Sequence, residues 1–259
     1  MRLRYVDPLR LVAAGASAIA LALGATTAIA QTAAGYPSKT IRIIVPFAPA
    51  GPNDILARVI GQKLNELWGH PVVIETRGGA GGTIGIEAAV KSPADGYTLA
   101  MGGSSNLAIA PGLYAKLAYD SLRDLAPVAN VAVVPYALAV NPHVPAKNVK
   151  ELVAIAKSKK GRLSYGSSGS GSVSSLAAEM LKAATGADIV HVPYKGTAPA
   201  VTDMIAGQID MMLADFATVE PFAKAGKLRL LALAGSRHIA LAPELPTIAE
   251  SGFAGFEVV

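Results

Sequence analysis

The sequence contains no cysteine and few aromatic residues, and both shortages narrow what the protein can be. Without cysteine there are no disulfides, no thiolate catalysis, no zinc site with cysteine ligands and no cysteine-linked lipid anchor. Phe, Trp and Tyr make up only 5% of the 259 residues, which disfavours a large aromatic-lined pocket. Apolar residues together reach 52%, so the chain has enough aliphatic side chains to bury a core.

The N-terminus has the layout of a secretory signal peptide. Three arginines within the first ten residues precede an apolar run over residues 11–24, and Ala28-Ile29-Ala30 then supplies small residues. This pattern predicts a signal peptide over residues 1–30, cleavage after Ala30 and a periplasmic mature protein. The alternative is an N-terminal membrane anchor, but the run is shorter than the ~20 residues that a spanning helix needs.

The charge balance gives no sign of a nucleic-acid partner. Without residues 1–30 the chain has 20 basic and 17 acidic residues, and the basic ones form no tract. Nucleic-acid binding is therefore not expected.

Strand-like and helix-like segments alternate along the chain. In the first part, β-rich apolar segments are expected as strands at 40–47, 71–75 and 97–101, and helical spacing is found at 54–68 and 86–91. This alternation is typical of a parallel sheet with helical crossovers. It restarts after Val140, with expected strands at 163–165, 189–193, 209–213 and 228–234 and expected helices at 149–159, 176–185, 200–207 and 219–225.

The restart predicts two lobes. The apolar stretch over 128–140 is expected to cross as a strand from one lobe to the other, and the segment over 228–234 to return. We therefore expect lobe 1 to comprise residues 31–135 and 232–259, and lobe 2 residues 136–231.

Five glycine- or serine-rich turns each lie between an expected strand and an expected helix, at 48–54, 77–85, 102–106, 167–174 and 195–199. In a parallel sheet such turns gather at the carboxyl ends of the strands, where ligands bind. Helix N-termini there offer unpaired N–H groups, and glycine lets a ligand approach the backbone. The set predicts an anion site, although Gly and Ser are also ordinary turn and cap residues.

Known catalytic motifs are not completed anywhere in the sequence. It contains no G-x-S-x-G elbow, no phosphate-binding P-loop and no full G-x-G-x-x-G fingerprint, and its four histidines lack metal-ligand spacing. We expect no enzyme activity, no cofactor and no metal. The enzymatic alternative is an exported hydrolase that uses a serine within 167–174. Asp54 remains open as a helix cap or a ligand contact, and His191 is expected to be structural.

Motifs along most of the chain resemble one family. They are Tyr36-Pro37, Pro46-Phe47, Ala50-Gly51, Asp54, Ala57-Arg58, residues 79–85 (GAGGTIG), 95–99 (DGYTL), Leu113-Tyr114, Tyr119-Asp120, 124–127 (DLAP), 165–167 (YGS), 191–196 (HVPYKG), Asp203, 245–247 (LPT) and 250–252 (ESG). The chain resembles the extracytoplasmic solute-binding proteins of tripartite tricarboxylate transporters, often called the Bug family.

The resemblance implies a two-lobed α/β fold of the type II periplasmic-binding (Venus flytrap) kind, each lobe a mostly parallel sheet flanked by helices. It implies a monomer that binds a di- or tricarboxylate or a related organic acid for integral membrane transporter subunits. A sensor subunit for a signalling receptor is the alternative. Members normally continue beyond Val259, so part of the family fold is expected to lie outside this sequence.

Carried over from this resemblance, the candidate ligand-binding residues fall into two sets. The first lobe is expected to contribute Ala48, Ala50, Gly51, Asn53, Asp54, Gly79, Ala80, Gly81, Gly82, Ser104 and Ser105. The second lobe is expected to contribute Ser168, Gly169, Ser170, Ser172, Lys195, Gly196, Thr197 and Asp215.

Overall fold

A computed structural model describes residues 35–158 and 163–258. The chain divides into two units, Met1–Ser38 and Lys39–Val259, and all the helices and strands described below lie in the second. The predicted signal peptide lies outside the described residues. Among the described helices, none is both long enough and apolar enough to span a bilayer.

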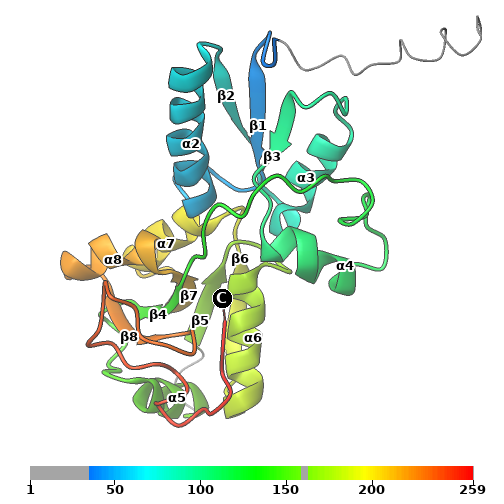
Figure 1. The fold of residues 1–259 in the computed structure, drawn as a ribbon. Helices are drawn as coiled ribbons and strands as arrows, with labels where there is room; N and C mark the ends of the chain where they lie inside the picture. Colours follow the sequence, from blue (N-terminus) through cyan, green and yellow to red (C-terminus); the bar gives the residue numbers. More distant parts are fainter. Residues whose placement is uncertain (1–34, 159–162, 259) are drawn as a thin grey trace, which may run out of the picture. The chain divides into compact units, whose positions relative to one another are not determined.

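A three-stranded parallel sheet forms the first half of the second unit. Its strands are β1 (Ile41–Val45), β2 (Val72–Thr76) and β3 (Thr98–Ala100), in the spatial order β2-β1-β3. Helix α2 (Pro52–Trp68) connects β1 to β2, and α3 (Thr83–Val90) connects β2 to β3. The two crossovers run in opposite directions along the sheet, so right-handed connections put their helices on opposite faces (Figure 1).

A five-stranded mixed sheet forms the other half. Its strands are β4 (Tyr136–Val140), β5 (Leu163–Ser167), β6 (Ile189–Pro193), β7 (Met211–Asp215) and β8 (Arg229–Leu233), in the order β6-β5-β7-β4-β8. Strand β5 pairs in parallel with β6 and β7, whereas β4 pairs antiparallel with β7 and β8. The predicted alternation of strands and helices is thus confirmed in both halves.

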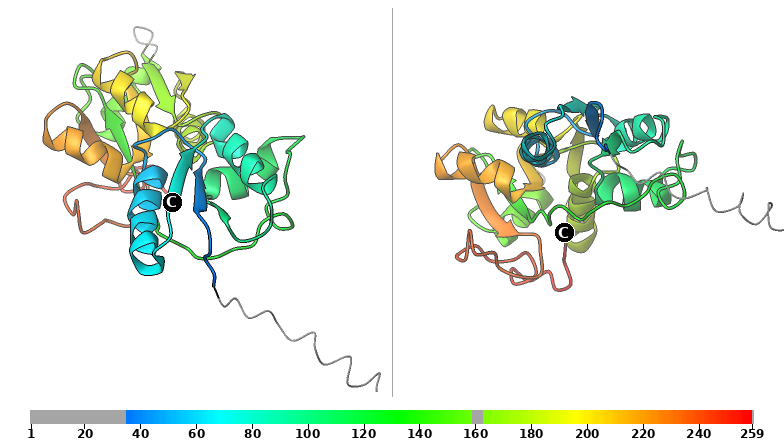
Figure 2. Two further views of the ribbon diagram at one scale, coloured as in Figure 1. Left: turned by 90° about the horizontal axis from the view of Figure 1, so that it is seen from above. Right: turned by 45° about the horizontal axis from the view of Figure 1, so that its top comes forward.

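Alternating side chains of this sheet build two cores, one on each face. Leu138 and Val140 of β4 pack on one face with α5 (Val149–Lys157) and α6 (Val173–Thr185). Ala137 and Ala139 pack on the opposite face with α7 (Thr197–Ile205) and α8 (Phe216–Lys224). The period-2 alternation of a strand explains this division, and Figure 2 shows the helices on both sides of the sheet.

Three segments differ from the sequence expectation. The expected turn at 102–106 runs into a π-helical turn, η3 (Ser105–Ile109), followed by α4 (Ala110–Leu113). The stretch over 128–135, expected to be part of a strand, is irregular and mostly exposed, because it has no neighbouring strand to pair with. Only residues 136–140 join a sheet.

The C-terminal segment also lies elsewhere than its expected lobe. Residues 232–259 were assigned to lobe 1, yet Ile248, Phe256 and Val258 pack into a core of the five-stranded sheet. The cause is long-range pairing: β8 pairs with β4, the Ile248 amide donates to the carbonyl of Leu233 at the end of β8, and the Val258 amide donates to the carbonyl of Ala234. The exact lobe boundaries stay a prediction.

Candidate functional site

Loops at the carboxyl ends of both sheets meet at one place, which we call the loop junction. It comprises residues 46–51, 78–82, 105 and 114 on the side of the three-stranded sheet, and 169–173 and 194–196 on the other. Three hydrogen bonds cross it: Ala48 N–H donates to the Lys195 carbonyl, Val173 N–H to Ser105 Oγ, and Tyr114 O–H to the Ser170 carbonyl, each at 3.0 Å. Strand ends of both sheets thus converge where ligands of open α/β sheets bind.

Glycines allow the two sides to approach this closely. A Cβ on Gly81 would lie 2.8 Å from the Ser170 carbonyl oxygen, and one on Gly169 would lie 2.9 Å from the Gly81 amide nitrogen. A Cβ on Gly196 would lie 2.9 Å from the amide nitrogen of Ala48. Any side chain at these positions would separate the backbones, so glycine is required for the contact.

The glycine loop, residues 78–82, leads into helix α3. Residues 79–82 all have positive φ angles: 135° at Gly79, 47° at Ala80, 63° at Gly81 and 96° at Gly82. Gly82 is the N-cap of α3 and provides no side-chain cap. The helix therefore begins with N–H groups that lack helical partners, and the partial positive charge of the helix N-terminus favours an anion there.

The serine loop, residues 168–175, is hydrogen-bonded mainly to itself. Ser174 Oγ lies 2.9 Å from both the Ser168 amide and the Ser172 hydroxyl, and 3.0 Å from the Ser168 hydroxyl. Ser172 caps α6 by accepting a hydrogen bond from the Ser175 amide. Of the predicted serines in this loop, only Ser170 is exposed. The predicted hydroxyls of Ser168 and Ser172 therefore fix the loop in its conformation.

Asp54 organises the start of α2. Its Oδ2 accepts hydrogen bonds from Ala50 N–H at 2.9 Å and from Arg58 Nε at 3.0 Å, while Gly51 is the N-cap residue. Burial by itself would raise the pKa of Asp54, but these two donors outweigh it and hold the pKa below its ordinary value. A charged carboxylate repels an acidic ligand, so this geometry disfavours the ligand contact. Asp54 is not the cap of α2 either, since that position is Gly51; it holds the preceding turn through the Ala50 amide.

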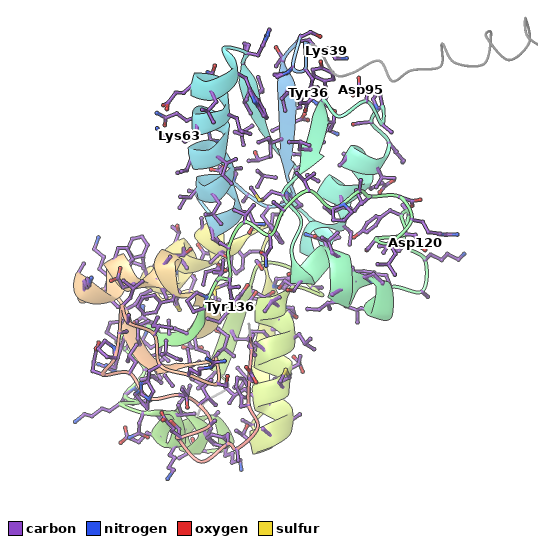
Figure 3. The ribbon with its side chains drawn as sticks, in the orientation of Figure 1. Tyr36, Lys39, Lys63, Asp95, Asp120 and Tyr136 are labelled. Atoms are coloured by element: carbon purple, nitrogen blue, oxygen red, sulfur yellow. The ribbon has the colours of Figure 1, made fainter. Side chains whose placement is uncertain are left out.

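A buried acid also lies beneath the other side of the junction. Asp215 Oδ2 accepts a hydrogen bond from Thr197 Oγ1 at 2.7 Å, and Asp215 faces Tyr136 across the β4–β7 ladder. Burial raises the pKa of Asp215, and burial together with this carboxylate raises that of Tyr136. Figure 3 shows Tyr136 where the long irregular segment enters the second sheet. Asp215 thus ties α7, β4 and β7 together.

Most of the predicted site residues lie at the junction, but several of them make their contacts there through backbone atoms. Ala48, Gly81, Ser105, Gly169, Ser170, Lys195 and Gly196 make the cross-junction contacts. The Asn53 side chain instead donates to the Met101 carbonyl, and Ser104 lines a separate cavity. Sequence reasoning missed Gly78, Tyr114 and Val173. Gly78 opens the same glycine run, Tyr114 belongs to a motif of the resemblance without a site role, and Val173 lies in the expected turn over 167–174.

One pair of side chains bears on the hydrolase alternative. Ser167 Oγ lies 2.7 Å from His191 Nε2. However, Ser167 is fully buried (0% exposed), its Oγ also accepts from the Gly169 amide, and His191 is stacked on Tyr165. The neighbouring Glu179 accepts a hydrogen bond from Tyr165. Because Ser167 Oγ also accepts from the Gly169 amide and Glu179 is bonded to Tyr165, we interpret the pair as holding the start of the serine loop.

Two cavities lie beside the junction rather than in it. One of about 290 Å³ is lined by Arg58, Gly61, Gln62, Asn65, Val72 and Ile74, between α2 and β2. The other, of about 200 Å³, is lined mainly by apolar residues of η3, α6 and the C-terminal segment. The N-terminus of α3, which follows the glycine loop, lines neither cavity. We therefore place the candidate anion site at the junction.

The sequence matches the model of the tripartite tricarboxylate transporter family receptors over residues 56–259. The chain belongs to this receptor family. Solved structures with the same fold include the periplasmic binding protein BugD, which is 34% identical with a TM-score of 0.81; the match covers 86% of this chain and 74% of BugD.

Two further relatives of this receptor come from Rhodopseudomonas palustris and were solved with ligands. A protein with adipate is 35% identical (TM-score 0.83; 86% of this chain and 75% of the relative covered). MatC with bound malate is 33% identical (TM-score 0.82; 86% and 76% covered). The receptor therefore has the two-lobed α/β fold of the periplasmic binding proteins, as the sequence predicted.

Proposed function

We propose that the chain binds a small carboxylate at the loop junction and delivers it to the membrane subunits of a tripartite transporter. The observation that carries the proposal is the convergence of backbone donors from both sheets, with the α3 N-terminus and the amides of Ala48 and Val173 on facing sides. Such donors neutralise an anion without a charged side chain. The adipate and malate of the two relatives belong to the same ligand class.

Separation of the two sides would free the donors for a ligand. The amides of Ala48 and Val173 are now paired with Lys195 and Ser105 across the junction. Opening about a hinge would break these bonds, and a carboxylate would then replace them when the sides close again. We propose the irregular segment over 128–135 as part of the hinge, since it leads from the side of the three-stranded sheet into β4. The sheets on either side would then be the cores of the two lobes.

The proposed cellular setting follows from the predicted signal peptide and the family. The chain would be exported, cleaved after Ala30 and act in the periplasm as a binding protein without catalysis. Its partners would be the organic acid and the integral membrane subunits of the transporter.

A thermal-shift panel tests the binding step. The mature protein is heated with malate, adipate, citrate, glutamate and benzoate, each at about 1 mM, with chloride as the ionic control. Binding with a dissociation constant near 10 μM predicts a stabilisation of about 2.7 kcal/mol. If all five acids leave the melting temperature where chloride leaves it, carboxylate capture is the wrong function.

A further inference from the structure

Asn106 presents a buried side-chain donor without a partner beside the glycine loop. Its residue is fully buried (0% exposed), and its Oδ1 accepts from Gly103 N–H at 3.0 Å. Its backbone carbonyl accepts from the Tyr119 hydroxyl at 2.5 Å. These two bonds fix the position and the orientation of the side chain, yet Nδ2 donates to no acceptor in the part of the chain that the structure describes.

The unpaired Nδ2 is directed at Gly82. A Cβ on Gly82 would lie 2.5 Å from Nδ2, and the φ angle of Gly82 is +96°. The same Cβ would also lie 3.1 Å from the Phe47 ring and 3.3 Å from Pro46, so only glycine lets the loop backbone lie beside Nδ2. Gly82 is also the N-cap of the eight-residue helix α3 and provides no side-chain cap. The Thr83 amide donates to the Ala80 carbonyl, so an acceptor beside Gly82 would meet Nδ2 and the remaining amides of the first helical turn.

Comparison with a second buried asparagine shows how unusual this is. Asn141 Nδ2 donates to the Met204 carbonyl at 2.6 Å, and its Oδ1 accepts from His143 N–H at 2.9 Å. Such pairing is the rule for buried polar groups because an unpaired N–H loses its hydration without compensation. Asn141 thus has a structural role, whereas Nδ2 of Asn106 is left without an acceptor among the described residues.

We propose that Asn106 is a ligand-contacting residue whose Nδ2 donates to one carboxylate oxygen of the bound acid, next to Gly82. The inference deepens the proposed function and rests on it. Nδ2 and the α3 amides are all donors, so this subsite selects a group with acceptor oxygens only, which is an ionised carboxylate.

The substitution Asn106→Asp tests the inference with little change of shape. It keeps the acceptor for Gly103 N–H and replaces only the donor by an acceptor. At pH 7.5 we expect malate and adipate to bind at least about a hundredfold more weakly in calorimetry, since two acceptors then face each other. Binding should recover as the pH falls, because a protonated carboxyl donates again. The wild type should show no such recovery.

Thr218→Val is the matched control. Thr218 Oγ1 is also buried without a partner, but it lies on α8. Its removal should therefore leave the dissociation constants for malate and adipate unchanged. If Asn106→Asp does not fold, the side-chain NH₂ resonance of Asn106 in the wild type is followed instead. A shift that saturates with malate or adipate supports the contact.

The possible outcomes separate the two proposals. If the wild type binds no acid of the panel, the proposed function fails and the inference fails with it. If the wild type binds but Asn106→Asp binds equally well, or the NH₂ resonance does not move at saturation, Asn106 is no ligand contact and only the inference is overturned.

Discussion

The two loops that face each other at the junction achieve their shape by different means. The glycine loop uses positive φ angles at four successive residues and has few side chains. The serine loop uses a hydroxyl hub at Ser174 that pairs its own polar groups. The shape of the first therefore depends on backbone conformation, and the second is held rigid by its own hydroxyl groups. Binding should depend on backbone geometry in the former and on side-chain hydrogen bonds in the latter.

The largest effect is expected in the glycine loop. Gly82→Ala introduces a Cβ 2.5 Å from Asn106 Nδ2 at a φ angle of +96°. The strained backbone should cost about 1–3 kcal/mol of unfolding free energy, and carboxylate binding should weaken at least about a hundredfold. Urea denaturation and calorimetry measure the two quantities. Unaltered affinity in a folded variant would remove the glycine loop from the site.

The next effect belongs to the serine loop. Ser174→Ala removes the acceptor of the Ser168 amide and the partner of two hydroxyls, which should cost about 1–3 kcal/mol of unfolding free energy. Ser170→Ala is the matched control: its side chain is exposed, so its effect should stay within about 0.5 kcal/mol. Equal losses of unfolding free energy in the two variants would contradict the role of Ser174 as the hydrogen-bonding centre of the loop.

The buried acids of the two sides should respond oppositely to pH. Asp54 has a lowered pKa, so its contribution is present above its ordinary value of 3.8 and is lost as pH falls through the folded value. Asp215 has a raised pKa, so its contribution is present below 3.8 and is lost as pH rises through the folded value.

Melting curves from about pH 3 to about pH 8 compare each Asn variant with the wild type. The excess stability of the wild type over Asp54→Asn should grow with pH. Its excess over Asp215→Asn should shrink with pH. Slopes of the same sign for the two variants would show that one of these environments is misassigned.

The smallest effect is expected at Lys195. Its side chain is exposed, and it joins the junction through its carbonyl oxygen, which accepts from Ala48 N–H. Lys195→Met should therefore change carboxylate affinity by less than about threefold, as is typical of an exposed charge. A tenfold loss would show that the ammonium group contacts the ligand.

Much of the fold could be predicted from the sequence because period-2 and period-3.6 patterns are local signals. The strand at β6 was placed over the residues that form it, and α5, α7 and β7 were placed within a few residues. The irregular stretch over 128–135 was not foreseen, since its apolar residues look like a strand and only the absence of a neighbour prevents pairing. The position of the C-terminal segment likewise depends on long-range pairing with β4 and β8.

In the candidate site, too, local features could be predicted from the sequence and long-range contacts could not. Glycine-rich turns after strands indicated the junction, because glycine has a local conformational meaning. The buried donor of Asn106 and the contact of Tyr114 with the Ser170 carbonyl could not be predicted, since both depend on which residues fold against each other. The same holds for Ser168 and Ser172, whose hydroxyls turn out to bond to Ser174.

Backbone resonances test most directly whether main-chain amides at the junction hold the acid. Malate and adipate are titrated into the ¹⁵N-labelled mature protein while the amide signals of Ala48, Gly81 and Val173 are followed. These signals should shift together and saturate at the dissociation constant measured by calorimetry. Saturable binding that leaves all three unmoved, with shifts confined to another face of the protein, would contradict the account.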